Sequence, residues 1–306
     1  MSNKRIKVGV IGVGHLGQHH VKHFKNLDYV DLIGIYDLDN DRSLSISHQY
    51  DVKRFQTINH LINETDALSI VTPTPSHSQI ASLCIKSSKH VFIEKPITTT
   101  LAEADNLLKL AKKFKVLIQV GHIERLNPAL LALESFNIKP KFIELQRLAP
   151  YTTRGTDVPV VLDKMIHDID ILLSLVNSKV DNIQATGLSI LTDSVDIAHA
   201  RIRFQNGSVA SIMSSRVAKD EVRKVKLFQK NLYTTIDLLL GLTEVYKITK
   251  NENKLQKKHL TFPFNYKKKK MFISYEKPKI KKLDALKMEL QNFILSIKKI
   301  ENPIVT

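Results

Sequence analysis

Residues 6–17 read I-K-V-G-V-I-G-V-G-H-L-G, and this stretch decides the fold of the N-terminal part of the chain. The apolar residues at 6–11 predict a buried strand, and Gly12, Gly14 and Gly17 follow it. In such a turn the first glycine permits the bend, the second lets a diphosphate approach the backbone, and the third lets the next helix pack closely. The helix N-terminus then points at the phosphates. The stretch predicts a dinucleotide-binding turn, with an ordinary strand–helix turn as the alternative.

A second apolar run, at residues 32–36, ends in Asp37. This position lies about 20 residues beyond the last glycine, where an acidic residue usually binds the adenosine ribose hydroxyls. A carboxylate there favours NAD over NADP, whose 2′-phosphate it would repel.

Predicted strands and helices alternate between residues 18 and 120, which indicates an α/β domain with a doubly wound parallel sheet, a Rossmann fold. In such sheets the ligand lies beyond the carboxyl ends of the strands. The glycine turn, Asp37, residues 72–77, E-K-P at 94–96 and Gly121-His122 all follow predicted strands. The predicted cofactor site therefore comprises Gly12, Val13, Gly14, His15, Leu16, Gly17, Asp37, Thr72, Pro73, His77, Glu94 and Lys95.

The pattern changes after about residue 122, where strongly β segments follow one another with short turns. Asn206-Gly207 between two of them is a hairpin signal. We therefore predict a Rossmann domain over 1–122 and an α+β domain with a large, open, mainly antiparallel sheet over 123–306. Its strands are expected at 142–148, 182–191, 196–204, 208–216, 222–230 and 233–240, with a final helix at 283–300.

A helix predicted over 163–177 carries Asp163, His167 and Asp170 on one face. Histidine suits removal of a hydroxyl proton near neutral pH, and a carboxylate one turn away can orient it or bind a neighbouring hydroxyl. A surface ion-pair set and a metal site are the alternatives; because no third ligand has clear spacing, we predict no metal. The opposite face is expected to pack inward through Ile166, Ile169, Leu173 and Val176.

Lys95 follows a predicted strand and precedes Pro96. Its ammonium is therefore expected over the cofactor edge, where it can donate hydrogen bonds or join proton transfer if its pKa is depressed. A solvated lysine is the alternative.

The composition is that of a globular protein, with 306 residues, 43% of them hydrophobic and 25% charged. No apolar run reaches the roughly 18 residues of a membrane span. The N-terminal M-S-N-K-R runs directly into the first strand, so no signal peptide is expected. The single cysteine, Cys84, cannot form an intrachain disulfide, which fits a cytoplasmic protein with a packed thiol.

The chain carries 46 Lys and Arg against 30 Asp and Glu, a net charge of +16. Such a balance suits nucleic acid, an anionic membrane or an anionic small substrate. Lysines concentrate at 257–258, 267–270 and 279–282, without a zinc-finger spacing or an aromatic–glycine RNA motif. We interpret them as solvated lysines and predict no nucleic-acid partner.

Four motifs together resemble the glucose–fructose oxidoreductase / inositol dehydrogenase / rhizopine-catabolism (Gfo/Idh/MocA) family. They are G-V-G-H-L-G at 12–17, V-T-P-T-P-S-H at 71–77, E-K-P at 94–96 and D-K-M-I-H at 163–167. The resemblance implies a Rossmann domain, an open-sheet domain that forms subunit contacts in a homodimer or homotetramer, a nicotinamide cofactor and a sugar or polyol substrate. By position, Lys95 and His167 match the family's catalytic pair, and Asp163 matches its substrate-binding aspartate.

Residues 120–129 and 154–170 resemble one branch of this family more closely, the UDP-N-acetylglucosamine 3-dehydrogenases of lipid A synthesis. Those enzymes make a 3-keto nucleotide sugar that an aminotransferase consumes. The resemblance makes Arg125, Arg147 and Arg154 candidates for diphosphate or sugar contacts, beside Lys95, Asp163 and His167.

Other functions stay open at the level of the sequence. They are oxidation of another sugar, an inositol or a small carbonyl compound, a dinucleotide-sensing regulator that binds nucleic acid, and an inactive relative. The last is suggested by the end at Thr306, where family members usually continue with a glycine turn and a helix.

Overall fold

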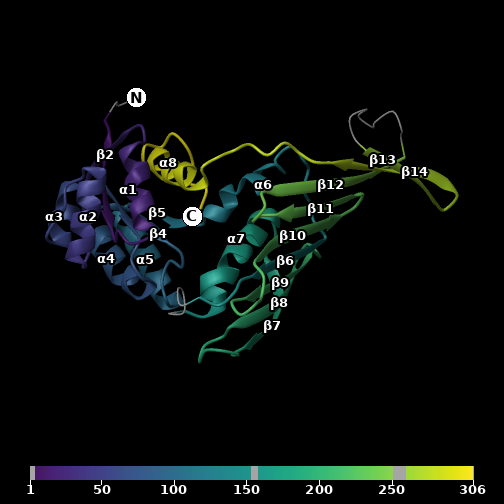
Figure 1. Ribbon diagram of the computed structural model, residues 1–306, viewed down its shortest axis with the longest axis horizontal. Coiled ribbons are helices and arrows are strands. Elements are labelled where there is room, and N and C mark those ends of the chain that lie inside the picture. Colours follow the sequence, from purple (N-terminus) through teal and green to yellow (C-terminus); the bar gives the residue numbers. More distant parts are fainter. Residues whose placement is uncertain (1–3, 153–157, 251–259, 306) are drawn as a thin grey trace. The chain divides into compact units, whose positions relative to one another are not determined.

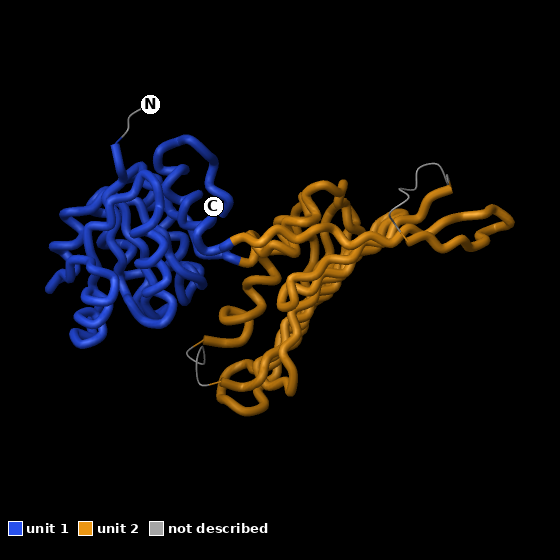
Figure 2. The backbone as a smooth tube through the Cα atoms, turned by 45° about the horizontal axis from the view of Figure 1, so that its top comes forward, with its two compact units in different colours: residues 1–123, 284–306 blue, residues 124–283 orange. Residues whose placement is uncertain are grey.

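The computed structural model describes residues 4–152, 158–250 and 260–305. The chain forms two compact units, one of residues 1–123 with 284–306 and the other of residues 124–283 (Figure 2). Among the described residues, no helix combines the length and the apolar character that crossing a bilayer requires.

The first unit contains a five-stranded parallel sheet in the order β2-β1-β3-β4-β5. The strands are β1 (Ile6–Ile11), β2 (Val30–Tyr36), β3 (Ala67–Ile70), β4 (His90–Glu94) and β5 (Ile118–Gly121). The strand order reverses at β1, which confirms the predicted doubly wound sheet and places the glycine turn at the switch point. A single parallel bridge joins Arg54 to Ile35 on β2.

Helices cover both faces of this sheet (Figure 1). They are α1 (Gly17–Lys25), α2 (Asn40–Tyr50), α3 (Ile58–Glu64), α4 (His77–Lys86) and α5 (Leu101–Phe114), with a short 3₁₀ turn, η1 (Thr74–Ser76), before α4. Val8 and Val10 pack with α1, whereas Ile11 packs with α3, α4 and α5. Cys84 lies in the second of these clusters, as predicted for a packed thiol, and burial raises its pKa to about 12.

The final helix, α8 (Ala285–Ile297), belongs to the first unit. Asp284 caps it by accepting a hydrogen bond from the backbone N–H of Lys287. Its buried residues Leu290 and Phe293 pack with α1, and the Phe293 ring lies 5.7 Å from that of Phe92 on β4. The structure thus differs from the predicted boundary, which placed this helix in the second domain. Proximity along the chain suggested that placement, but the apolar side of α8 is buried in the core beside α1.

The second unit contains a nine-stranded sheet in the order β13-β14-β12-β11-β10-β6-β9-β8-β7. Every neighbouring pair is antiparallel except β6 and β9, which confirms the predicted mainly antiparallel sheet. Gly207 adopts φ +81° in the β8–β9 turn, as the Asn206-Gly207 hairpin signal predicted. The strands are β6 (Phe142–Leu148), β7 (Val180–Leu188), β8 (Ile197–Phe204), β9 (Val209–Ser215), β10 (Val222–Gln229), β11 (Leu232–Asp237), β12 (Leu242–Thr249), β13 (Leu260–Tyr266) and β14 (Lys269–Glu276).

Two helices, α6 (Pro128–Leu131) and α7 (Ile166–Leu175), lie on one face of this sheet (Figure 1). A 3₁₀ turn, η2 (Ile123–Leu126), precedes α6, and a π-helical turn, η3 (Val161–Met165), precedes α7. The prediction of which residues of α7 face inward is partly wrong. Leu173 is 50% exposed, whereas Met165, Ile171 and Leu172 are buried with Val176.

Removing the Phe293 ring is expected to destabilise the first unit. Phe293→Ala should lower its free energy of unfolding by about 3–5 kcal/mol, because the ring is fully buried against Phe92. Lys287→Ala on the exposed side of α8 is the matched control and should change the value by less than about 0.5 kcal/mol. Urea unfolding followed by circular dichroism measures both. Equal small effects would contradict the packing of α8 in this core.

Candidate active site

The glycine turn after β1 has the geometry that dinucleotide binding requires. Gly12 adopts φ +85°, and a Cβ added there would lie 2.6 Å from the Val71 carbonyl oxygen. A Cβ on Gly17 would lie 2.0 Å from the carbonyl oxygen of Gly12, so only glycine lets α1 start this close to the strand. A Cβ on Gly14 would meet no atom within 4 Å. Gly14 therefore borders open space at the point where a diphosphate would approach the backbone.

Asp37 connects the end of β2 to this turn. Its Oδ2 accepts a hydrogen bond from the backbone N–H of Val13 at 2.8 Å, and its Oδ1 accepts one from that of Asp39 at 2.9 Å. Arg42 lies 3.4 Å from Oδ1 and also pairs with Asp39 at 2.9 Å. The carboxylate thus lies beside the glycine turn, at the position predicted for binding the ribose hydroxyls. His15 and Leu16, also predicted in the site, are exposed on this turn.

The two other predicted loops of the cofactor edge are joined by His77. This buried ring lies with Nδ1 2.9 Å from the carbonyl oxygen of Pro96 and Nε2 2.7 Å from that of Thr72. Both nitrogens contact backbone carbonyls, so His77 holds the loop containing Thr72 and Pro73 against the E-K-P turn. The Lys95–Pro96 peptide bond is cis. The sequence indicated His77 as a site residue but not this bridging role.

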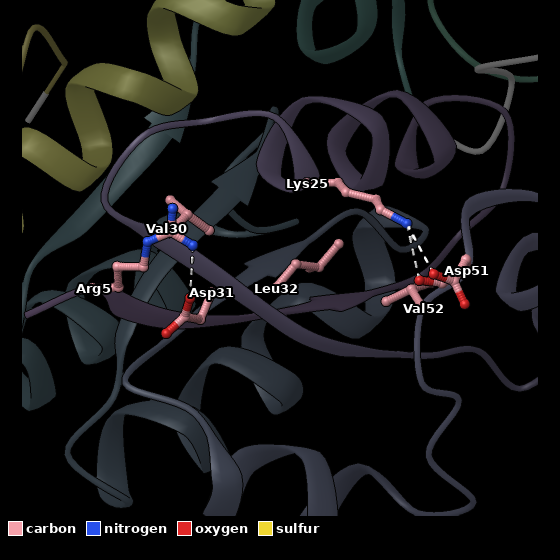
Figure 3. A pocket seen from close by; sticks show the side chains of 7 residues that line it. All are labelled: Arg5, Lys25, Val30, Asp31, Leu32, Asp51 and Val52. Carbon is pink, nitrogen blue, oxygen red and sulfur yellow. Dashed lines mark hydrogen bonds and ion pairs between the residues drawn. The ribbon is translucent and has the colours of Figure 1, made fainter.

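The opposite edge of the sheet has a hollow of about 210 Å³ (Figure 3). It lies near the start of β2, away from the carboxyl ends of the strands, and its lining residues are Arg5, Lys25, Val30, Asp31, Leu32, Asp51 and Val52. Arg5 pairs with Asp31 at 3.1 Å and Lys25 with Asp51 at 3.5 Å. Its charged side chains are paired with one another, and the hollow is not part of the candidate cofactor site.

In the second unit, Asp163 and His167 lie in two different kinds of helical turn. Asp163 is in the π-helical turn η3, and His167 is in the first turn of α7. Asp163 is part-buried and lies 3.2 Å from Lys164. π-helical turns inside helices frequently occur at functional sites. The sequence placed both residues on one regular helix, and the apolar periodicity gave no signal for the wider turn.

Two arginines hold α7 in place. Arg147 on β6 donates to both oxygens of Asp168, at 2.9 and 3.0 Å, and to Glu124 at 2.9 Å. Arg125 in η2 donates to both oxygens of Asp170, at 2.7 and 2.8 Å. Bidentate pairs of this kind fix orientation as well as position. They attach α7 immediately after His167 to the sheet and to η2.

This arrangement gives the predicted arginines a structural part. Arg147 is 4% exposed and Arg125 has two nitrogens on Asp170, so the contacts seen for both are with carboxylates of this chain. Arg154 lies outside the described residues. Burial would lower the pKa of Arg147, but Asp168 and Glu124 raise it. Burial also raises the pKa of Asp168. Arg147 lowers this pKa, but the nearby Glu124 raises it, so the pKa stays above its ordinary value.

A second buried pair, Asp196 and Arg216, anchors the segment before η3. Asp196 Oδ2 accepts hydrogen bonds from the backbone N–H groups of residues 190–192 at 2.7–2.9 Å. Arg216 donates through Nε to Asp196 at 2.8 Å and through Nη1 to the Val158 carbonyl oxygen at 2.9 Å. The backbone N–H of Val160 in turn donates to Val195. Sequence reasoning missed this pair, because its members are 20 residues apart on different elements.

Comparison with known proteins identifies the family to which this chain belongs. The model of the Gfo/Idh/MocA oxidoreductase family, NAD-binding Rossmann fold, matches residues 6–122, and the model of the family's C-terminal domain matches residues 140–229. The chain is 34% identical over 242 residues to UDP-N-acetylglucosamine 3-dehydrogenase of Acidithiobacillus ferrooxidans, covering 79% of this chain and 77% of that protein. The chain belongs to the Gfo/Idh/MocA oxidoreductase family. Its sequence resemblance to this family is thereby confirmed.

Other family members and solved structures agree with this assignment. Myo-inositol 2-dehydrogenase of Thermotoga maritima is 29% identical over 233 residues, covering 70% of this chain and 69% of that protein. The crystal form P21 of the Acidithiobacillus ferrooxidans UDP-N-acetylglucosamine 3-dehydrogenase matches with a TM-score of 0.85 and 30% identity, over 98% of this chain and 91% of that chain. These relatives are dehydrogenases of sugar or cyclitol hydroxyls, and this Gfo/Idh/MocA chain is an oxidoreductase of the same type.

Gly14 and Gly17 are expected to respond differently to alanine. Gly14→Ala should fold normally, because its Cβ enters open space, yet weaken NADH binding by about tenfold or more, ~1.4 kcal/mol. Gly17→Ala should lower the melting temperature, because its Cβ would overlap the Gly12 carbonyl oxygen. NADH fluorescence titration and thermal unfolding measure the two effects. A Gly14→Ala protein that binds NADH like the wild type would contradict the assignment of this turn.

Asp196 is expected to make stability depend on pH in the acidic range. Burial would raise its pKa, but the hydrogen bonds from the Thr192 backbone and from Arg216 outweigh it, and the pKa lies well below the ordinary range. The folded pKa is below the unfolded value of about 3.9. The stabilisation is therefore present above about pH 4 and is lost as pH falls through the folded pKa.

The free energy of unfolding measured between neutral pH and pH 3 tests this. Asp196→Asn should show a shallower decline below about pH 4 than the wild type, because asparagine does not titrate. Asp193→Asn, a neighbouring carboxyl, is the control and should keep the wild-type slope. The same decline in all three proteins would show that Asp196 is not the titrating group.

Proposed function

We propose that this protein oxidises the C3 hydroxyl of UDP-N-acetylglucosamine to a 3-keto nucleotide sugar, with NAD as the acceptor. The observation that carries this proposal is the 34% identity to UDP-N-acetylglucosamine 3-dehydrogenase over 79% of the chain. The candidate residues support it, since Lys95 directly follows β4, Asp163 lies in η3 and His167 lies in α7. The net charge of +16 suits a dianionic substrate.

The residues present fit a bound NAD. Gly14 borders open space for the diphosphate, and Asp37 offers carboxylate oxygens beside the turn for the ribose hydroxyls. Arg42, the cation nearest the Asp37 carboxylate in the contacts above, is itself paired with Asp37 and Asp39. A carboxylate here together with a paired arginine favours NAD over NADP, whose 2′-phosphate would meet negative charge.

Oxidation of a hydroxyl removes a hydride from carbon and a proton from oxygen. When bound, the nicotinamide accepts the hydride. In our proposal His167 takes the hydroxyl proton with the aid of Lys95, and Asp163 holds the sugar. The two arginine–carboxylate pairs of α7 orient His167 for this role.

The product and the setting follow from the same proposal. A 3-keto sugar is a substrate for an aminotransferase, so we propose such an enzyme as the next step, in a cell-envelope sugar pathway such as lipid A synthesis. Since NAD and nucleotide sugars are cytoplasmic metabolites, we propose a cytoplasmic location. Myo-inositol is the alternative substrate, because the Thermotoga maritima relative is named for its oxidation.

Activity with UDP-N-acetylglucosamine tests the substrate and the site together. The wild type should form NADH, followed at 340 nm, and Lys95→Ala and His167→Ala should each reduce the rate by about 10²–10⁴-fold, as expected for loss of a group that moves or holds a proton. Lys86→Ala and His60→Ala, both exposed, are the matched controls. A hydrazine that traps ketones, or an aminotransferase with an amino donor, removes product that would otherwise hold the reaction back.

Two outcomes would contradict this proposal. If the protein binds NAD but oxidises no nucleotide sugar even with the trap present, the substrate is wrong, and myo-inositol and free sugars are tested next. If sugar is oxidised and Lys95→Ala and His167→Ala keep wild-type rates, the site is wrong.

We also propose that the protein is a homodimer or homotetramer that associates through the nine-stranded sheet. On the face opposite α6 and α7, aromatic residues lie opposite one another on five strands. Neighbouring ring centroids are 4.8–5.7 Å apart along the row Phe142, Phe228, Tyr233, Tyr246 and Tyr275. Phe142 and Phe228 are each 39% exposed, and apolar side chains of this kind favour association.

Light scattering after size exclusion tests the association. The wild type should elute as a dimer or tetramer, and Phe228→Asp should shift it toward monomer, because a charge would be buried in the contact. Leu38→Asp, at an 87% exposed residue of the first unit, is the control and should leave the mass unchanged. A monomeric wild type would overturn this proposal.

A further inference from the structure

His20 is a fully buried histidine in the core of the first unit, on the inner face of α1. Its Nδ1 lies 2.9 Å from the hydroxyl oxygen of Ser69, which is also fully buried on β3. Its Nε2 lies 3.2 Å from Oε1 of Glu94. The ring centroids of the apolar neighbours Phe24 and Phe92 lie 6.5 and 5.6 Å from that of His20.

The groups around the ring determine which of its two nitrogens carries a hydrogen. Glu94 can only accept, so the Nε2 that faces it carries a hydrogen, while Nδ1 can accept from the Ser69 hydroxyl. Within the described part of the chain, Nε2 makes no contact with hydrogen-bond geometry, so its 3.2 Å contact with Oε1 of Glu94 is an electrostatic one and not a well-aligned hydrogen bond. A buried polar nitrogen in apolar surroundings is costly unless it interacts with a partner. The Glu94 carboxylate is therefore the group that makes a histidine favourable at position 20.

Glu94 is held from two other sides. It is the last residue of β4, opposite Gly121 of β5. A Cβ on Gly121 would lie 2.8 Å from Oε1 and 3.0 Å from Oε2, so the glycine provides the space that the carboxylate occupies. The backbone N–H of Lys95 donates to Oε2 at 3.2 Å. The carboxylate is thus enclosed at the edge of the sheet where the cofactor is expected, and its side chain keeps 13% of its surface exposed there.

We propose that His20, oriented by Ser69, is a positioning residue that holds the Glu94 carboxylate at the cofactor edge. The interaction connects the interior of the sheet to the first residue of the E-K-P turn. Since Oε2 also accepts from the backbone of Lys95, a displaced carboxylate would release the start of that turn. The inference rests on the proposed cofactor site, but it does not depend on the identity of the sugar.

Two substitutions separate positioning from packing. His20→Leu fills the apolar surroundings but cannot donate to Glu94, whereas the side-chain amide of His20→Gln can. NADH affinity and kcat should each fall by about tenfold in His20→Leu, the loss expected for one polar contact with a charged group, and return to within about threefold in His20→Gln. His19→Leu, an exposed residue beside it, is the matched control and should behave like the wild type.

A double substitution tests whether the effect passes through Glu94. Glu94→Gln alone should weaken NADH binding, and adding His20→Leu to it should cause little further loss, because the partner of His20 has already been changed. Losses that multiply in the double variant would show independent roles and overturn the proposal.

The NADH titration is independent of any sugar, so it also separates this proposal from the proposed substrate. If UDP-N-acetylglucosamine is not oxidised, the titration still reports whether His20 supports the cofactor edge. Unchanged NADH affinity in His20→Leu would overturn the inference. Equal losses in His20→Leu and His20→Gln, in step with equal falls in melting temperature, would assign His20 to packing alone and would also overturn it.

Discussion

The close approach of Gly17 to the carbonyl oxygen of Gly12 is the contact on which the first unit depends. It sets the start of α1 directly behind the turn that ends β1, and it leaves Gly14 facing open space. Asp37 then connects this turn to β2 through Val13, and His77 connects the loop after β3 to the turn after β4. Each connection uses a backbone group at a strand end, so the turns at the carboxyl edge of the sheet are linked to one another by side-chain contacts. A cofactor edge of this kind is preorganised, which lowers the cost of ordering it when the cofactor binds.

In the second unit, helix α7 carries charged residues on the side that faces the core, and these residues need buried partners. Asp168 and Asp170 are buried and each meets an arginine in a bidentate pair. Breaking either pair would leave a buried charge without its partner, which is strongly destabilising. The position of His167 on α7, one residue before Asp168, is therefore maintained by interactions that contribute to folding. We infer that folding and the geometry of the proposed site are closely linked in this unit.

Local patterns in the sequence were sufficient for the parallel sheet, the glycine turn and the mainly antiparallel second sheet. Each depends on short-range spacing, such as the three glycines of the turn or the Asn206-Gly207 hairpin signal. The docking of α8 on the first unit was not predictable in this way, since it depends on Phe293 meeting Phe92, far away in the chain. The same holds for the pairs of Arg147 with Asp168 and of Arg125 with Asp170, whose members lie far apart in the chain. The π-helical turn at Asp163 left no mark in the apolar periodicity, and the inward face of α7 was mispredicted in consequence.

The central claim is that hydride leaves C3 of a UDP-linked sugar on this protein. The most direct measurement uses UDP-N-acetylglucosamine carrying deuterium at C3, with NAD and a ketone trap, and mass spectrometry of both products. We predict that the NADH formed contains one deuterium, that the trapped sugar has lost it, and that kcat/KM falls relative to the unlabelled substrate. NADH without deuterium, formed while the sugar keeps its label, would show that another carbon or another compound is oxidised and would contradict the account.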